Sequence, residues 1–241
     1  MSEERSEHGD PIYRYKEPRK DWTPPDMSSP SLEVIDAHIA AHVGKVDTVW
    51  HEAISDVVHI DVHVVKPTQD RPYYTLITSG MSDLPMKAPP KAAEYRFAEL
   101  MMCLPADWPM SQEAWKDTCH YWPIYWLKVL ARFPHQFDTW LWYGHTMPNG
   151  DPSEPVAKNS AFECMLLGPP MTVSTDFWRL QVSADKMIYF FAVFPLYPEE
   201  VELKLKKGAD ELFTRFEKSK ITELVDIRRR NVAKKEWWRL F

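Results

Sequence analysis

Alternating apolar and polar residues mark the first strands of the chain. Valine or isoleucine occupies positions 58, 60, 62 and 64, and His59, Asp61 and His63 lie between them. This period of two is typical of a strand with one face buried and the other in solvent. Residues 73–79 have a similar character, and the proline-bounded turn at residues 67–72 predicts that the two strands form a hairpin.

Helical periodicity and breaker residues divide the rest of the chain. A helix is predicted over residues 30–43, with Ser29 as its N-cap. Further helices are predicted at residues 111–119, 122–133 and 199–217, and further strands at residues 97–104, 139–145, 162–168 and 187–194. These elements predict an α+β fold in which a mixed, largely antiparallel β-sheet is flanked by helices.

Composition divides the chain into three parts. Residues 1–30 hold five prolines among charged residues, which predicts a flexible, proline-rich arm that is dispensable for folding. Residues 31–227 predict a single domain. Residues 228–241 form a basic, aromatic tail with six basic residues and one acidic residue, whereas residues 1–227 have 23 basic and 34 acidic residues. The acidic body favours a basic protein partner, and the tail leaves nucleic-acid binding as an alternative.

Composition also argues against several protein classes. The chain is 44% hydrophobic and 27% charged, and it lacks the run of about 18–20 apolar residues that a membrane helix needs. The acidic N-terminus differs from a signal peptide, so we expect a cytoplasmic protein. Seven scattered glycines and three cysteines provide neither a glycine-rich phosphate loop nor a Cys-x-x-Cys zinc motif. We expect no cofactor.

Candidate catalytic and metal-binding residues are few. His59, Asp61 and His63 share one strand face, so they could bind a divalent cation and leave a metal-dependent hydrolase as an alternative function. The same alternation is typical of a solvent-facing strand, and we assign no metal ligand. Ser79 and Cys119 lie outside known nucleophile motifs, so we predict no catalytic residue.

Aromatic residues are concentrated in one part of the chain. Eleven large aromatic side chains lie between residues 108 and 143, more than one helix stripe and one strand face need for a core. Aromatic residues are also enriched in binding hot spots. The cluster therefore fits either core packing or a protein-binding surface.

Six segments of the chain carry a family resemblance. They are residues 59–68 (HIDVHVVKPT), 71–86 (RPYYTLITSGMSDLPM), 98–109 (AELMMCLPADWP), 122–135 (WPI to LARFPH), 143–152 (YGHTMPNGDP) and 194–200 (FPLYPEE). In order and in sequence these segments resemble the suppressor-of-fused family in its bacterial form. The resemblance implies a mixed α/β domain without enzymatic activity that binds other proteins. Animal members clamp a peptide of Gli-type transcription factors between two domains, and bacterial members are similar to immunity proteins or antitoxins of polymorphic toxin systems.

The resemblance also implies a partner surface. The groove beside residues 131–133 and 143–145 has counterparts that face the bound peptide in animal members, although a histidine stands at position 145 where animal members carry an acidic group. We predict a non-catalytic binding module, an immunity protein or antitoxin that binds a toxin such as a basic nuclease, and no membrane partner. A nucleic-acid partner is less favoured than a protein partner and stays the alternative given by the basic tail. The expected partner-binding residues are Asp83, Phe133, Trp140, His145, Asn149 and Asp151.

Overall fold

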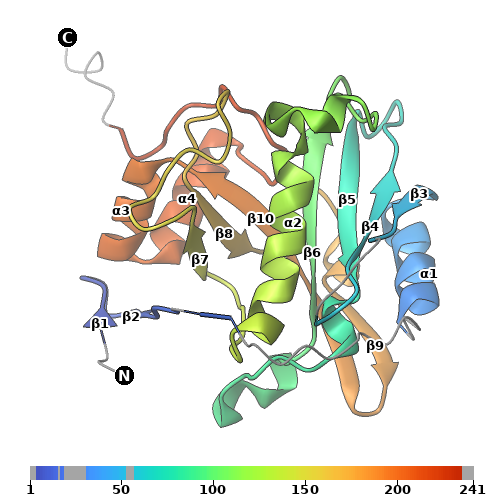
Figure 1. The fold of residues 1–241 in the computed structure, drawn as a ribbon, viewed down its shortest axis with the longest axis horizontal. Coiled ribbons are helices and arrows are strands. Elements are labelled where there is room, and N and C mark those ends of the chain that lie inside the picture. Colours follow the sequence, from blue (N-terminus) through green and yellow to red (C-terminus); the bar gives the residue numbers. More distant parts are fainter. Residues whose placement is uncertain (1–3, 16, 19–30, 53–56, 235–241) are drawn as a thin grey trace.

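A large β-sheet forms the centre of the computed structural model, which describes residues 4–15, 17–18, 31–52 and 57–234 (Figure 1). Seven strands follow one another in the order β3-β4-β5-β6-β10-β8-β7, and β9 pairs with β10 to complete eight strands. Their bounds are β3 Val46–Trp50, β4 Asp61–Val65, β5 Tyr73–Ser79, β6 Ala98–Pro105, β7 Thr146–Pro148, β8 Cys164–Gly168, β9 Arg179–Ser183 and β10 Lys186–Leu196. Among these described strands, β6 and β10 run parallel and the other pairs are antiparallel. The α+β prediction is confirmed.

The helices cover both faces of the sheet. They are α1 Leu32–His42, α2 Thr118–Gln136, α3 Pro198–Lys207 and α4 Ala209–Ser219, and the short 3-10 helices are η1 Met81–Asp83, η2 Pro90–Tyr95, η3 Ala114–Lys116 and η4 Thr175–Trp178. Trp126 and Leu127 of α2 pack with Leu100 on one face. Ile35 of α1 and Phe213 of α4 belong to the cluster on the other face. Figure 1 shows α2 crossing the sheet along β6. No helix in the described part of the chain is long and apolar enough to cross a membrane.

Several predicted elements differ from the structure. The predicted hairpin is correct, with His63 of β4 opposite Ile77 of β5. Residues 139–145 are not a strand, because the chain turns there before the short β7. The helix predicted over residues 199–217 is two helices separated by Gly208, which has a φ of +84°. Ser29, the predicted N-cap, lies outside the described residues, and α1 begins after Ser31.

The polar face of β4 is not in solvent as its alternation predicted. The side chain of His63 is 0% exposed, and Asp61 is also buried. Helix α1 lies over this face, and the Oδ1 atom of its Asp36 is 3.4 Å from His63 Nδ1. A polar alternation therefore does not distinguish solvent from a covered polar layer.

Described segments near both termini contact the domain. Residues of the predicted arm form a small ribbon, β1 Glu4–Arg5 with β2 Pro11–Ile12. At the other end, Arg229 lies against Glu200 of α3 with only 8% of its side chain exposed. The part of the basic tail up to residue 234 is thus packed on the domain, whereas Trp237, Trp238 and Arg239 lie outside the described residues.

Candidate protein-binding surface

The C-terminal end of α2 presents two aromatic rings beside a fixed turn. The ring centroids of Phe133 and Phe137 are 4.7 Å apart. His135 is buried, and its Nε2 lies 2.9 Å from the carbonyl oxygen of Met81. This contact ties the helix end to η1, and burial lowers the pKa of His135. The aromatic pair is therefore held on a rigid element.

The N-terminal segment lies directly on this aromatic pair. The ring of Tyr15 meets Phe133 edge-on at 5.1 Å and lies 5.5 Å from Phe137. Its hydroxyl is 2.6 Å from Thr139 Oγ1. One tyrosine thus combines an apolar contact with a hydrogen bond at its polar end, which is a common use of this side chain at interfaces.

The same segment continues over β7 to α3. Arg14 Nη1 donates to Asp151 Oδ2 at 2.9 Å, and Asp10 Oδ2 lies 3.5 Å from Lys204 Nζ. The backbone N–H of His8 donates to the carbonyl oxygen of Leu205 at 3.0 Å. In Figure 1 the dark blue segment passes below α3 and β7 toward the lower end of α2. We call the area under residues 8–15 the arm surface.

His145, which precedes β7, is partly buried. Its Nδ1 accepts a hydrogen bond from the backbone N–H of Trp142 at 3.2 Å, and its ring meets Trp140 edge-on at 5.1 Å. Burial, and then the charge of Lys204, lower the pKa of His145 to about 4. The imidazole is therefore neutral at physiological pH and helps to hold the turn.

Two of the six predicted residues, Phe133 and Asp151, contact the arm directly. Trp140 packs on His145, and His145 is linked to the arm by the charge of Asp10, which acts on its imidazole. Asn149 instead serves its own loop, because its side-chain amide donates to the carbonyl oxygens of residues 154 and 155 at 3.0 and 3.1 Å. Asp83 belongs to η1, where its charge acts on buried Glu99.

No residue of the arm was among the predicted partner-binding residues, although the arm contacts two of them. Tyr15 and Lys204 both contribute to the contact. Tyr15 stands among prolines and charges, a composition that indicates an extended chain. The signal available in the sequence was therefore a pair of tyrosines, Tyr13 and Tyr15, in a segment that has no core to bury them.

Most of the predicted aromatic surplus is used for packing. Trp122 and Trp126 are buried, and Trp108, Trp115, Tyr121, Phe133, Trp140, Trp142 and Tyr143 are partly buried against the same core cluster. Tyr125 is the clear exception, with 51% of its surface exposed. Core packing thus explains the larger part of this aromatic cluster.

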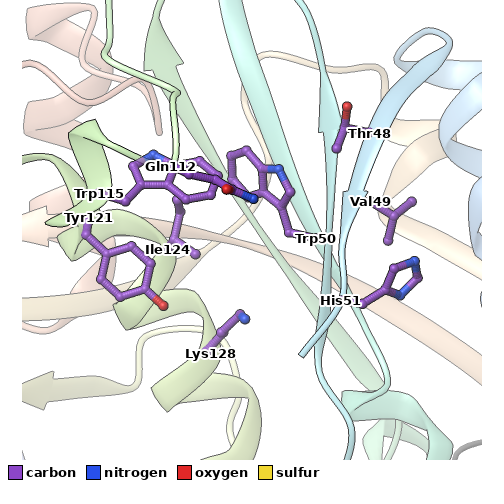
Figure 2. A pocket seen from close by; sticks show the side chains of 9 residues that line it. All are labelled: Thr48, Val49, Trp50, His51, Gln112, Trp115, Tyr121, Ile124 and Lys128. Atoms are coloured by element: carbon purple, nitrogen blue, oxygen red, sulfur yellow. The ribbon is translucent and has the colours of Figure 1, made fainter. Parts of the chain in front are cut away.

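A cavity lies between β3 and α2. Its volume is about 420 Å³. Figure 2 shows Trp50 and His51 on the β3 side and Tyr121, Ile124 and Lys128 on the α2 side. Trp50 meets Trp115 edge-on at 3.9 Å. Burial lowers the pKa of Lys128, although Asp61 opposes this effect.

The histidines considered for metal binding are only partly brought together. His59 Nε2 lies 3.0 Å from Asp61 Oδ1, but His63 turns away toward Ser79, whose Oγ is 2.9 Å from His63 Nε2. With Asp36 behind it, His63 completes a Ser-His-Asp order that resembles a hydrolase triad. Ser79 is only 1% exposed, so its hydroxyl cannot meet a substrate in this conformation.

Comparison with known proteins finds one matching family model and several solved structures with a similar fold. The Suppressor of fused protein (SUFU) family model matches residues 56–230. A SUFU homologue from Neisseria gonorrhoeae FA 1090 superposes with a TM-score of 0.62 at 16% identity, over 86% of this chain and 100% of that chain. The Sufu-Fu complex structure gives a TM-score of 0.58 at 14% identity, over 85% and 93%. Drosophila Suppressor of Fused gives 0.50 at 14% identity, over 73% and 43%.

The family is assigned by the sequence model rather than by these distant superpositions. No curated protein sequence matches the chain, and identities of 14–16% support only the fold. The family model, however, covers more than half of the residues, including β4 to β10, α2, α3 and α4. The chain therefore belongs to the SUFU family.

Proposed function

We propose that this chain is a non-catalytic protein-binding module that acts as an immunity protein and neutralises a toxin by direct binding at the arm surface. The observation that carries the proposal is that this surface already holds a polypeptide segment, the chain's own residues 8–15, through Tyr15, Arg14 and Asp10. The SUFU family is a family of binding proteins, and one relative was solved as a Sufu-Fu complex.

The chemistry of the arm surface suits an extended basic and aromatic segment. Phe133 and Phe137 form an apolar floor, and Thr139 offers a hydroxyl beside it. Asp151 supplies a carboxylate, and 83% of its side chain is exposed. A partner segment with a tyrosine and an arginine at the spacing of Tyr15 and Arg14 would make the same contacts.

The arm is a replaceable occupant of this surface. Its Arg14–Asp151 ion pair is exposed, with the two side chains 60% and 83% exposed, and exposed ion pairs contribute only about 0–1 kcal/mol each. The second pair joins Asp10 to Lys204, whose side chain is 8% exposed. Tyr13, Arg14 and Tyr15 remain exposed even when the arm is in place. A partner that buries Phe133 more completely would therefore displace the arm. The excess of 34 acidic over 23 basic residues in residues 1–227 would speed the approach of a basic toxin.

The test is coexpression of this chain with the protein encoded by the neighbouring gene, assayed first for toxicity on its own. Coexpression of both proteins should restore colony survival, and calorimetry with the purified toxin should measure the affinity. Phe133→Ala and Asp151→Lys should weaken binding, Phe133→Ala by about 2 kcal/mol as for an interface hot spot. Tyr125→Ala is the matched control, because Tyr125 is an exposed aromatic residue of the same helix.

The outcomes separate the two parts of the proposal. If colonies survive but the purified chain does not bind the toxin, direct neutralisation is contradicted. Equal affinity of Phe133→Ala, Asp151→Lys and the parent chain would place the interface elsewhere. Failure of the chain to protect against the toxin would refute the immunity role.

A further inference from the structure

Three potential metal ligands converge where β3 ends and β4 begins. Asp61 is the first residue of β4, and His51 follows the last residue of β3. Because Trp50 pairs with Val62 in the antiparallel register, the next residue along, His51, lies opposite Asp61. His59 precedes Asp61 by two residues, and its ring also turns toward the Asp61 carboxylate.

The ligand atoms have nearly the separation that a small cation imposes. His51 Nδ1 lies 3.0 Å from Asp61 Oδ2, and His59 Nε2 lies 3.0 Å from Asp61 Oδ1. One ligand atom from each of the three residues lies within 4.8 Å of the others. Ligand atoms around tetrahedral zinc, with bonds of about 2.0–2.1 Å, are about 3.3 Å apart. Small displacements of the side chains would therefore place an ion between them.

Burial gives the cluster a closed side and an open side. The side chains of Asp61 and His59 are 4% and 9% exposed, whereas that of His51 is 62% exposed. His51 also lines the cavity of about 420 Å³ (Figure 2). A bound ion would thus be held from the protein side and could complete its coordination with water from the cavity, as three-ligand zinc sites do.

The surrounding structure fixes the ligands and balances charge near them. Gly80 has a φ of +100°, and a Cβ at this position would lie 1.8 Å from the carbonyl oxygen of His59, so the segment that carries His59 is packed tightly on Gly80. Glu52 pairs with Arg132 and lies 3.9 Å from Lys128 Nζ. The two nearby cations therefore have a carboxylate partner other than Asp61.

We propose that His51, His59 and Asp61 bind one divalent transition-metal ion, for which Zn²⁺ is the best match, with an open coordination position toward the cavity. Two imidazole nitrogens and one carboxylate oxygen are suitable ligands for such ions. Each imidazole would bind the ion through the nitrogen that faces Asp61, so that nitrogen must be unprotonated in the metal complex. The ion would join the edge strand β3 to β4, and this inference does not depend on the proposed protein partner.

The test uses the full chain, freed of metal with a chelator and dialysed. Titration with Zn²⁺ against a chromophoric chelator should show one ion per chain. His51→Ala should weaken zinc binding by more than about 100-fold, since loss of an outer-shell partner alone costs roughly 10–100-fold. His51 is exposed, so this variant should fold. The matched control is His42→Ala, because His42 and His38 form the other close histidine pair, with ring centroids 4.5 Å apart.

Cobalt loading distinguishes this site from the cysteines. Co²⁺ bound by His51, His59 and Asp61 should give visible d–d bands without thiolate charge-transfer absorption. Absence of saturable binding to the parent chain would overturn the proposal. Undiminished affinity in His51→Ala, an equal loss in His42→Ala or thiolate bands in the cobalt spectrum would overturn it as well.

Discussion

Arg229 and Glu200 form a two-pronged ion pair that anchors the C-terminal segment inside the domain. Arg229 Nη1 donates to Glu200 Oε1 at 2.7 Å, and Nη2 donates to Oε2 at 2.5 Å. The guanidinium also lies 4.8 Å from the ring centroid of Tyr197 and 5.2 Å from that of Phe216. The pair is thus part of the aromatic packing beside α3.

Removal of Arg229 should strongly destabilise the fold. Arg229→Ala leaves the buried carboxylate of Glu200 without its cation, which typically costs about 3–5 kcal/mol. Urea unfolding monitored by circular dichroism measures the change. Arg228→Ala is the matched control, because Arg228 is exposed and should change the free energy of unfolding by no more than about 0.5 kcal/mol. Equal effects of the two variants would show that the pair contributes little.

Glu99 should make stability depend on pH in an unusual direction. It is fully buried, and burial raises its pKa to about 7, although hydrogen bonds from Ser82 and Thr78 oppose the shift. Between the pKa of about 4.3 of an unfolded glutamate and about 7, the folded state binds more protons than the unfolded state. The contribution of Glu99 is therefore present below about pH 4.3 and is lost as the pH rises to about 7.

Between about pH 4.3 and about pH 7, the free energy of unfolding should fall by about 3 kcal/mol because of Glu99 alone. Glu99→Gln removes the titration, so the difference in unfolding free energy between Glu99→Gln and the parent chain should change across this range. Urea unfolding at a series of pH values measures it. The histidines with lowered pKa, such as His145 and His63, act in the opposite direction, so the comparison with Glu99→Gln is essential. A constant difference between the two proteins would contradict the prediction.

The sequence predicted those elements in which local periodicity and tertiary packing agree. β5 has the predicted bounds of residues 73–79, and α1 differs from the prediction by one or two residues at each end. β10 was correctly predicted as buried on both faces, since its middle residues are apolar throughout. In these cases a single pattern in the chain reflects the environment of the element.

The remaining features depend on contacts between distant segments. β3 was missed because its pattern of partly buried and exposed residues is that of an edge strand. Arg229 looked like part of a basic tail, because its partner Glu200 is 29 residues away. For the candidate site, Phe133 and Asp151 could be chosen from their positions at a helix end and a turn, but their common contact with residues 14 and 15 is not encoded in local spacing.

The arm should stabilise the surface modestly and compete with a partner. Tyr15→Ala removes the ring contact with Phe133 and the hydrogen bond to Thr139. We expect a lower melting temperature by less than about 5 °C and tighter binding of a partner that uses the arm surface. Tyr13→Ala is the matched control, because 56% of Tyr13 is exposed. A chain that begins at Ser29 should behave like Tyr15→Ala; a larger fall in melting temperature would show that the fold requires the arm.

Substitution of Gly80 should show how much stability depends on the close contact between Gly80 and the backbone of His59. Gly80 and Gly9 have similar φ values of +100° and +97°, but a Cβ at Gly80 would lie 1.8 Å from the His59 carbonyl oxygen, whereas a Cβ at Gly9 would meet nothing within 4 Å. Both alanine substitutions carry the strain of a positive φ, about 1–2 kcal/mol. Only Gly80→Ala also forces β4 and the end of β5 apart, so it should cost more than about 4 kcal/mol. Calorimetry should therefore show a lower melting temperature for Gly80→Ala than for Gly9→Ala, since only Gly80→Ala adds a steric clash to the backbone strain. Similar melting temperatures would mean that the His59 segment moves away from Gly80 at little cost.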